Sequence, residues 1–278
     1  MAESLYLRDG TSPHRYLPTE LTRGPWSPDA QHGGPPSALL AMGLEAHDDD
    51  KAPRRPVDSD DAMFVARLSV DLLRPVPLTP LQLHVRAERP GRKVQLLAAS
   101  LVAGDTEVAR ATALRIRRKH LEIPEGAFPV LEAPRPPQEG RETSTPWHHR
   151  GNLLAYHSDA VDHRFVVGGF DRPGPAVDWI RLRVPLVDGE PTPAVSRVAA
   201  AADFGNGVSW TLSRVDGYQF INPDLTLYLH AYPAGEWVCL DATTYPQPHG
   251  VGLAESRLWG EQGVIGRSLQ SLLLERVG

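Results

Sequence analysis

The chain carries the same pattern of segments twice. In the first copy, residues 32–118, an apolar helix that starts with glycine and proline precedes four strand-like segments. In the second copy, residues 192–276, an alanine-rich helix precedes four more. Alignment of the two last strands places Ala113 on Gln270, so only the second copy keeps a polar side chain there. A duplicated unit of one helix and antiparallel strands predicts two similar halves, and we expect chemistry in the half that keeps its polar groups.

Length, charge and cysteine content limit the class of protein. At 278 residues the chain has room for two ordinary domains, and its net charge of -5 without a basic stripe argues against a nucleic-acid partner. The single cysteine, Cys239, cannot form an internal disulfide, which fits a reducing cytoplasm. The N-terminus lacks the pattern of a signal peptide and no apolar run reaches transmembrane length. We therefore expect a soluble cytoplasmic protein with no membrane partner.

Proline content divides the chain. We expect an N-terminal domain over residues 1–120, a linker over 121–150 and a C-terminal domain over 151–278. The linker contains six prolines, and because proline has no backbone N–H we expect no regular helix or strand ladder in it. A charged segment within the N-terminal domain, residues 48–56, is expected to be a solvated loop.

Hydrophobic alternation and turn residues predict the elements of each half. In the first half these are a hairpin over 4–8 and 15–18, the helix over 32–47, and strands over 64–73, 81–89, 93–102 and 107–118. In the second half they are strands over 165–170 and 179–186, a helix over 192–203 with Thr192 as N-cap, and strands over 218–231, 236–244, 251–259 and 264–276. Short turns between such strands indicate antiparallel meanders. One helix wrapped by a long antiparallel sheet, present twice, is an α+β double hotdog.

Most of the usual catalytic apparatus is absent from the sequence. There is no Gly-x-Ser-x-Gly nucleophile motif, and Cys239 lies in an apolar strand where we expect a buried core thiol. No cysteine pair or His-x-x-x-His spacing indicates zinc, and the neighbours His148 and His149 beside the linker are only a weak metal candidate. No glycine-rich phosphate loop is present. We therefore expect neither a metal nor a nucleotide cofactor.

Three polar residues of the second half remain as candidates. Asp203 ends the alanine-rich helix, where the negative end of the helix dipole opposes ionisation of a carboxyl group. Gln270 lies within an apolar strand, and a buried amide needs partners for both ends. Asn222 precedes Pro223 at the start of a strand. Taken singly, each has a purely structural alternative: a helix-end solubiliser, a residue on the outer strand face, and a turn former.

Four segments of the second half resemble bacterial acyl-CoA thioesterase II and its actinobacterial relatives, the double-hotdog thioesterases. They are Trp179–Arg181, Ala202–Phe204, Phe220–Leu225 and Gly263–Gln270. That family uses an Asp at the end of the second helix, a Thr or another small polar residue at the start of the next strand, and a Gln in the last strand. The resemblance implies Asp203, Asn222 and Gln270 as the catalytic residues, with Asn222 standing where the best-known members have Thr.

The mechanism that the resemblance implies is direct attack of water on a thioester. Asp203 would accept a proton from a water that Asn222 and Gln270 also hold. The backbone amides of Gly33 and Gly34, at the electropositive start of the first helix, suit the oxyanion that forms, because glycine permits close backbone approach. These glycines would face the second half across the interface of the pseudo-dimer. His32 beside them could assist in binding substrate, and a hydrogen-bonded structural role is an equal alternative.

Two other readings stay open at this point. A hotdog hydratase would need an Asp/His pair such as Asp224 and His230, but Asp71 takes the place of Asp224 in the first repeat, which indicates a structural role. A non-catalytic hotdog that binds an acyl thioester or a hydrophobic metabolite is a more serious alternative, because fold does not determine function. We expect an acyl-CoA thioesterase of lipid metabolism that acts on a medium-length or unusual acyl chain, and assembly as a homo-oligomer stays open.

Overall fold

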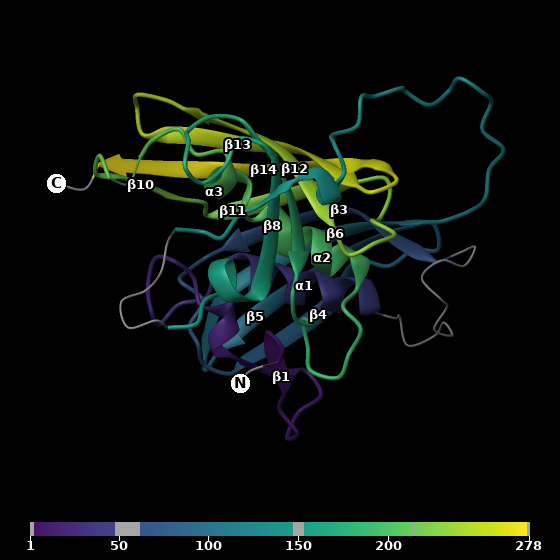
Figure 1. The fold of residues 1–278 in the computed structure, drawn as a ribbon. Coiled ribbons are helices and arrows are strands. Elements are labelled where there is room, and N and C mark those ends of the chain that lie inside the picture. Colours follow the sequence, from purple (N-terminus) through teal and green to yellow (C-terminus); the bar gives the residue numbers. More distant parts are fainter. Residues whose placement is uncertain (1–2, 48–61, 147–152, 214, 277–278) are drawn as a thin grey trace.

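The protein is an antiparallel sheet that curves around two helices (Figure 1). The computed structural model describes residues 3–47, 62–146, 153–213 and 215–276. The central helices are α1 (Gly34–Ala46) and α2 (Ala194–Ala202), and a short helix α3 (Gly205–Val208) follows α2. The turns η1 (Glu20–Thr22) and η2 (Pro137–Glu139) are 3-10 helices, and η3 (Tyr156–Ala160) is a single turn of π-helix.

The strands of the two halves join edge to edge. Those of the first half are β1 (Tyr6–Arg8), β2 (Arg15–Pro18), β3 (Met63–Leu72), β4 (Leu81–Arg89), β5 (Val94–Ala103) and β6 (Thr106–Arg117). Those of the second half are β7 (Arg141–Glu142), β8 (Val161–Val167), β9 (Ala176–Leu182), β10 (Tyr218–Ile221), β11 (Asp224–Leu229), β12 (Val238–Pro246), β13 (Val251–Gly260) and β14 (Gly263–Arg276). Their order in the sheet is β1-β2-β4-β5-β6-β3-β11-β14-β13-β12-β9-β8-β7, with β10 paired to β14. The seam between the halves is therefore the β3–β11 pair.

The strand register confirms the internal alignment. Ser69 faces Thr112 in the first half, and Thr226 faces Leu269 in the second. Ser69 and Thr226 are 157 residues apart, and so are Thr112 and Leu269. The same offset places Ala113 on Gln270, as the sequence predicts.

The predicted equivalence of Asp71 and Asp224 is wrong. By the offset of 157 residues, Asp71 corresponds to Tyr228 of the second half. Asp71 and Asp224 instead face each other across the seam. Asp71 pairs with Arg110 at 2.9 Å, while Asp224 accepts a hydrogen bond from the Ser271 N–H at 2.6 Å. The aspartates meet because β3 and β11 run antiparallel past the pseudo-twofold axis, which sequence similarity alone does not show.

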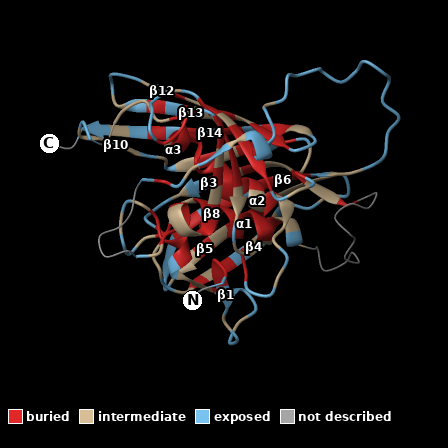
Figure 2. Cartoon of the chain, in the orientation of Figure 1, coloured by how far each residue is buried: buried red, intermediate tan, exposed pale blue. Residues whose placement is uncertain are grey.

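The core lies between the sheet and the two helices (Figure 2). Leu39, Leu40 and Leu44 of α1 are fully buried, and burial of each such side chain stabilises the fold by about 1.5–3 kcal/mol relative to exposure. The helices pack closely, and the Ser196 hydroxyl of α2 donates to the Ala38 carbonyl of α1 at 2.9 Å. At Gly43, a Cβ atom would lie 2.6 Å from a methyl group of Leu83, so a larger residue would force that side chain to move. This packing brings the start of α1 beside the end of α2.

The predicted helices and strands are largely present, with four local corrections. The strand expected over 218–231 is broken into β10 and β11 at Asn222 and Pro223, because proline cannot donate to the ladder. The strands expected over 165–170 and 179–186 begin earlier, as β8 and β9. Thr192 does not cap α2: its hydroxyl accepts from the Leu186 N–H, and Pro193 is the N-cap. The linker contributes η2 and β7, which pairs with β8.

Further expectations concern Cys239, membrane crossing, the charged segment and the histidine pair. Cys239 is fully buried in β12, as predicted, and burial raises the pKa of its thiol well above the usual value. Within the described ranges, no helix combines the length and the apolar character that a membrane crossing requires. The charged segment 48–56 and the pair His148 and His149 lie outside the described residues.

Candidate active site

A cavity of about 370 Å³ lies between the two halves. Residues 24–27, 30–33 and 72–76 of the first half and residues 157, 203–204, 206–207 and 220–223 of the second half line it. Most of its wall is apolar, and its polar end contains His32, Asp203 and Asn222. Neither half alone could form this cavity.

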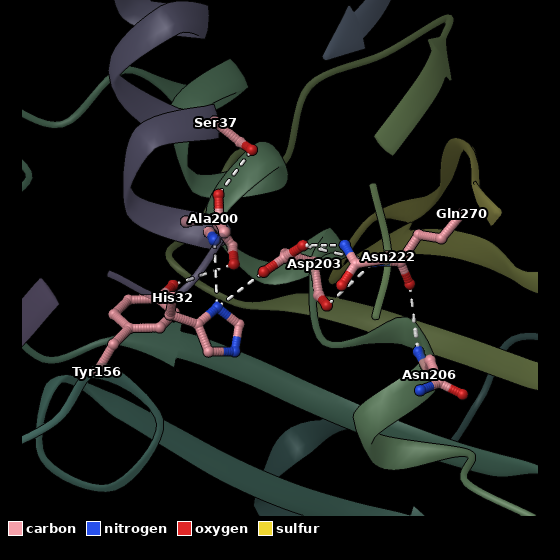
Figure 3. A network of polar contacts seen from close by, with 10 residues as sticks. His32, Ser37, Tyr156, Ala200, Asp203, Asn206, Asn222 and Gln270 are labelled. Atoms are coloured by element: carbon pink, nitrogen blue, oxygen red, sulfur yellow. Dashed lines mark hydrogen bonds and ion pairs between the residues drawn. The ribbon is translucent and has the colours of Figure 1, made fainter. Parts of the chain in front are cut away.

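Asp203 is the centre of the polar end (Figure 3). It is the C-cap of α2 and only 7% exposed. One carboxylate oxygen, Oδ2, lies 2.7 Å from His32 Nδ1, and the other, Oδ1, accepts from Asn222 Nδ2 at 2.7 Å and from Gln270 Nε2 at 3.4 Å. Three side chains from distant parts of the sequence therefore hold one carboxylate.

Gln270 supports Asp203 from behind. Its Nε2 also donates to the Asp203 backbone carbonyl at 3.2 Å, and its Oε1 accepts from the Asn206 N–H at 3.2 Å. The residue is 1% exposed, so the alternative that it lies on the outer strand face is wrong. It does not line the cavity. At Gly205, a Cβ atom would lie 2.7 Å from Gln270 Oε1, so this glycine makes room for the amide.

Asn222 borders the cavity directly. The break between β10 and β11 places its side chain beside Asp203, and this explains why a residue before a proline contributes to the site. Its Nδ2 is bound to Asp203, whereas its Oδ1 has no hydrogen-bond partner among the described residues. The amide oxygen is therefore available to a molecule in the cavity.

His32 completes the polar end from the first half. Its ring packs against two aromatic rings, with centroids 5.0 Å from Tyr156 and 4.7 Å from Phe204. The Tyr156 hydroxyl donates to the Ala200 carbonyl at 3.0 Å, and burial raises the pKa of that hydroxyl well above its usual value. Tyr156 thus stays neutral and fixes the position of the imidazole.

The two glycines after His32 differ in their relation to the cavity. Gly33 lines it, and its N–H has no hydrogen-bond partner in the part of the chain that the structure describes. Gly34 is buried, and its N–H points at His32 Nδ1 from 3.2 Å. A Cβ atom at Gly33 would lie 2.8 Å from Asp203 Oδ2, and one at Gly34 would lie 2.7 Å from the Ala200 carbonyl oxygen. A side chain at Gly33 would displace the Asp203 carboxylate and one at Gly34 would collide with the α2 backbone, but only Gly33 borders the cavity.

A second cavity occupies the position related to the first by the repeat. Its volume is about 1270 Å³, and it lies between the end of α1 and residues 229–234. The offset of 157 residues puts Ala46 there in place of Asp203, and Ala113 in place of Gln270. His230 lines this second cavity, whereas Asp224 is bound to the Ser271 N–H, so these two residues do not form the pair that a hydratase needs.

Several residues of the site carry no clear sequence signal. Asn206 lies in a Gly-Asn-Gly segment that reads only as the end of a helix, and Tyr156 stands in no recognisable pattern. Trp26 and Phe220 form an edge-to-face pair, with centroids 5.1 Å apart, on the cavity wall. Within the described ranges, no group of three or more His, Cys, Asp or Glu residues is placed to hold a metal ion.

Comparisons with known proteins assign the class. A family model described as the acyl-CoA thioesterase N-terminal domain matches residues 22–116, and one described as the acyl-CoA thioesterase C-terminal domain matches residues 130–274. The protein is thus a thioester hydrolase with the double-hotdog fold. The chain belongs to the acyl-CoA thioesterase family.

Solved structures show the same fold. A putative thioesterase from Novosphingobium aromaticivorans is 22% identical, with a TM-score of 0.71 and coverage of 99% of this chain and 100% of that one. A putative thioesterase II from Thermobifida fusca is 18% identical, with a TM-score of 0.69 and coverage of 99% and 96%. A hot dog fold protein of unknown function from Alicyclobacillus acidocaldarius is 16% identical, with a TM-score of 0.67 and coverage of 96% and 95%. None of the curated proteins matches the chain significantly.

Proposed function

We propose that this protein hydrolyses the thioester of an acyl-CoA with a medium-length or unusual acyl chain, in the cavity between its halves. The observation that carries the proposal is the Asp203 carboxylate, which Asn222, Gln270 and His32 hold at the polar end of an otherwise apolar cavity. A thioester carbonyl at that end would have a basic group on one side and room for an acyl chain on the other.

The proposed reaction is direct attack by water. A water near the polar end, where Asn222 Oδ1 is free, loses a proton to a basic group of this end, Asp203 or His32, as its oxygen attacks the thioester carbon. The N–H of Gly33 is the candidate donor to the oxyanion that forms, because it borders the cavity and binds no described residue. Collapse of the intermediate breaks the C–S bond, and the sulfur takes up the proton to give a free thiol and a carboxylic acid.

Gln270 has a positioning role in this proposal. Both ends of its amide are engaged within the protein, so it orients the carboxylate and the start of α3 rather than the water. Asn222 takes the place that the resemblance assigns to Thr. Its amide both orients Asp203 and leaves an acceptor oxygen for the water.

The shape of the cavity supports the substrate class. A volume of about 370 Å³ is at the lower end of the range of about 300–1,000 Å³ that is usual for small-molecule sites. Leu72, Leu73, Val76 and Ile221 are on its wall, which suits an acyl chain of moderate length. We further propose that the enzyme acts in the cytoplasm, in lipid metabolism, and that any homo-oligomer leaves this cavity open.

Release of free thiol from acyl-CoAs of increasing chain length tests the proposal. The unsubstituted protein should release thiol, and Asp203→Asn should remove that activity because an amide can neither act as the base nor stabilise a charged His32 imidazole as the carboxylate does. The control is Asp105→Asn, in the exposed turn between β5 and β6, which should keep full activity. If the folded, unsubstituted protein binds acyl-CoA but releases no thiol, the proposal is refuted and the reading as a binding protein replaces it.

A further inference from the structure

His32 places a second basic group in the cavity. Its Nδ1 lies 2.7 Å from Asp203 Oδ2, while its other nitrogen, Nε2, makes no hydrogen bond with any described residue. Figure 3 shows Nδ1 turned towards Asp203 and Nε2 pointing away from α1. The imidazole side chain is 11% exposed and the Asp203 side chain only 3%. Of the two, the imidazole is therefore the group that a water in the cavity reaches more easily.

The contact with Asp203 determines which nitrogen carries the proton. A carboxylate accepts hydrogen bonds and cannot donate, so the 2.7 Å contact requires a proton on Nδ1. The Gly34 N–H is farther from Nδ1, at 3.2 Å. Once Nδ1 carries a proton it has no lone pair to accept a hydrogen bond from this N–H. In a neutral imidazole with the proton on Nδ1, Nε2 has a free lone pair and is a base.

The surroundings hold this arrangement in place. Tyr156 and Phe204 pack against the ring, and the His32 N–H donates to the Thr22 carbonyl at 2.8 Å. The absence of a Cβ atom at Gly33 lets the carboxylate approach the imidazole. His32 lines the cavity, and an imidazole that a carboxylate orients through one nitrogen while the other stays free is the general-base arrangement of hydrolytic triads.

We propose that His32, and not Asp203, takes the proton from the attacking water. This inference rests on the proposed thioesterase function and identifies the catalytic base of that site. The water oxygen bonds to the thioester carbon as one of its protons moves to Nε2, and Asp203 stabilises the imidazolium through Nδ1–H. When the C–S bond breaks, the Nε2 proton passes to the sulfur. The products are a free thiol and a carboxylic acid, and the neutral imidazole is restored.

His32→Asn separates the two candidate bases. An asparagine amide reaches about the place of Nδ1, so it can still donate to Asp203, but it has no counterpart of Nε2. The expected result is a fall in kcat of about 100-fold or more, with KM within a few-fold of the unsubstituted protein. His32→Gln is the second variant, in case the first does not fold. The control is His84→Asn on the exposed face of β4, which should leave both constants unchanged.

The pH dependence of kcat/KM distinguishes a catalytic role of His32 from a purely structural one. If His32 is the base, its protonation at low pH stops the reaction, so the acid limb of the profile should change or disappear in His32→Asn. The other titratable groups that face His32 are Asp203 from α2, and Tyr156 and His157 from η3. Burial raises the pKa of Tyr156 well above its usual value, so this residue stays neutral over the acid limb of the profile. Addition of free imidazole should partly restore the rate of His32→Ala.

The results separate this inference from the function on which it rests. If His32→Asn keeps near-normal kcat and its acid limb while Asp203→Asn is inactive, Asp203 itself is the base and the inference is wrong. If the unsubstituted protein releases no thiol, the proposed function fails, and the inference fails with it. Loss of turnover in His32→Asn, with loss of the acid limb and rescue of His32→Ala by imidazole, supports the inference.

Discussion

Substitution of Gly33 by alanine tests the geometry of the site directly. The backbone of Gly33 has φ -65° and ψ -23°, a helical conformation that alanine adopts without strain. Away from any steric conflict, such a change stabilises a protein by about 0.4–1 kcal/mol because it restricts the unfolded chain. The only expected penalty is therefore steric, and it falls on the Asp203 carboxylate.

The size of that penalty follows from the structure. The new Cβ atom would lie 2.8 Å from Asp203 Oδ2 and 2.9 Å from Oδ1, whereas ordinary contacts begin at 3.4 Å. The carboxylate or the start of α1 must therefore move by about 0.6 Å, the difference between 3.4 and 2.8 Å. Such a movement lengthens the contacts to His32 and Asn222, and displacements of about 1 Å at a reaction centre can cost about 100-fold in rate.

Steady-state kinetics and thermal unfolding measure the two effects separately. We expect Gly33→Ala to lose between about 10-fold and 100-fold in kcat, with a small change in Tm. The control is Gly10→Ala, where a Cβ atom meets nothing within 4 Å, and it should keep full activity. An active Gly33→Ala with an unchanged or higher Tm would show that the carboxylate does not lie against Gly33, and would refute the described site.

Three further predictions concern the second half. Gln270→Leu should leave the buried Asn206 N–H without its acceptor and reduce the free energy of unfolding by about 1–3 kcal/mol, measured in urea, together with a loss of kcat. A stability equal to that of the unsubstituted protein would contradict the described contacts. Asn222→Thr should keep kcat within about 10-fold, because a hydroxyl can both donate to Asp203 and accept from water. A complete loss of turnover would show that the amide is essential. Burial, and to a smaller extent Asp178 and Asp241, raise the pKa of the Cys239 thiol, so a thiol reagent at about pH 8 should react only after unfolding. Rapid reaction in the folded state would disprove the burial.

Local patterns explain most of the architecture. The alternation in residues 81–89 predicts β4 with its observed bounds, and the alanine run before Asp203 predicts that this residue ends a helix. Pro223 breaks the strand that alternation predicts through it, because the missing N–H is a local property that alternation does not weigh. The offset between the repeats was also readable from the last strands, and the ladders of both halves confirm it.

The candidate site was only partly readable in advance. Asp203, Asn222 and Gln270 could be named because a polar residue among apolar ones stands out, and because the family resemblance places them. Their mutual contacts could not be predicted, since an isolated Gln in a strand is compatible with either face. The engagement of both ends of the Gln270 amide, which removes it from the cavity, depends on where α3 places the Asn206 N–H.

The sequence by itself determined that the chain is a duplicated helix-and-sheet unit, and that one copy lost polar groups that the other kept. These properties follow from periodicity and composition, which act over neighbouring residues. The family resemblance led us to expect Gly33 to face the second half, but only the tertiary structure decided that His32 and Gly33 contact the Asp203 carboxylate. That meeting depends on the packing of α1 against α2 and on the β3–β11 seam. Contacts of this kind form between residues that are far apart in the chain, so they are set by the packing of whole elements and not by any local pattern.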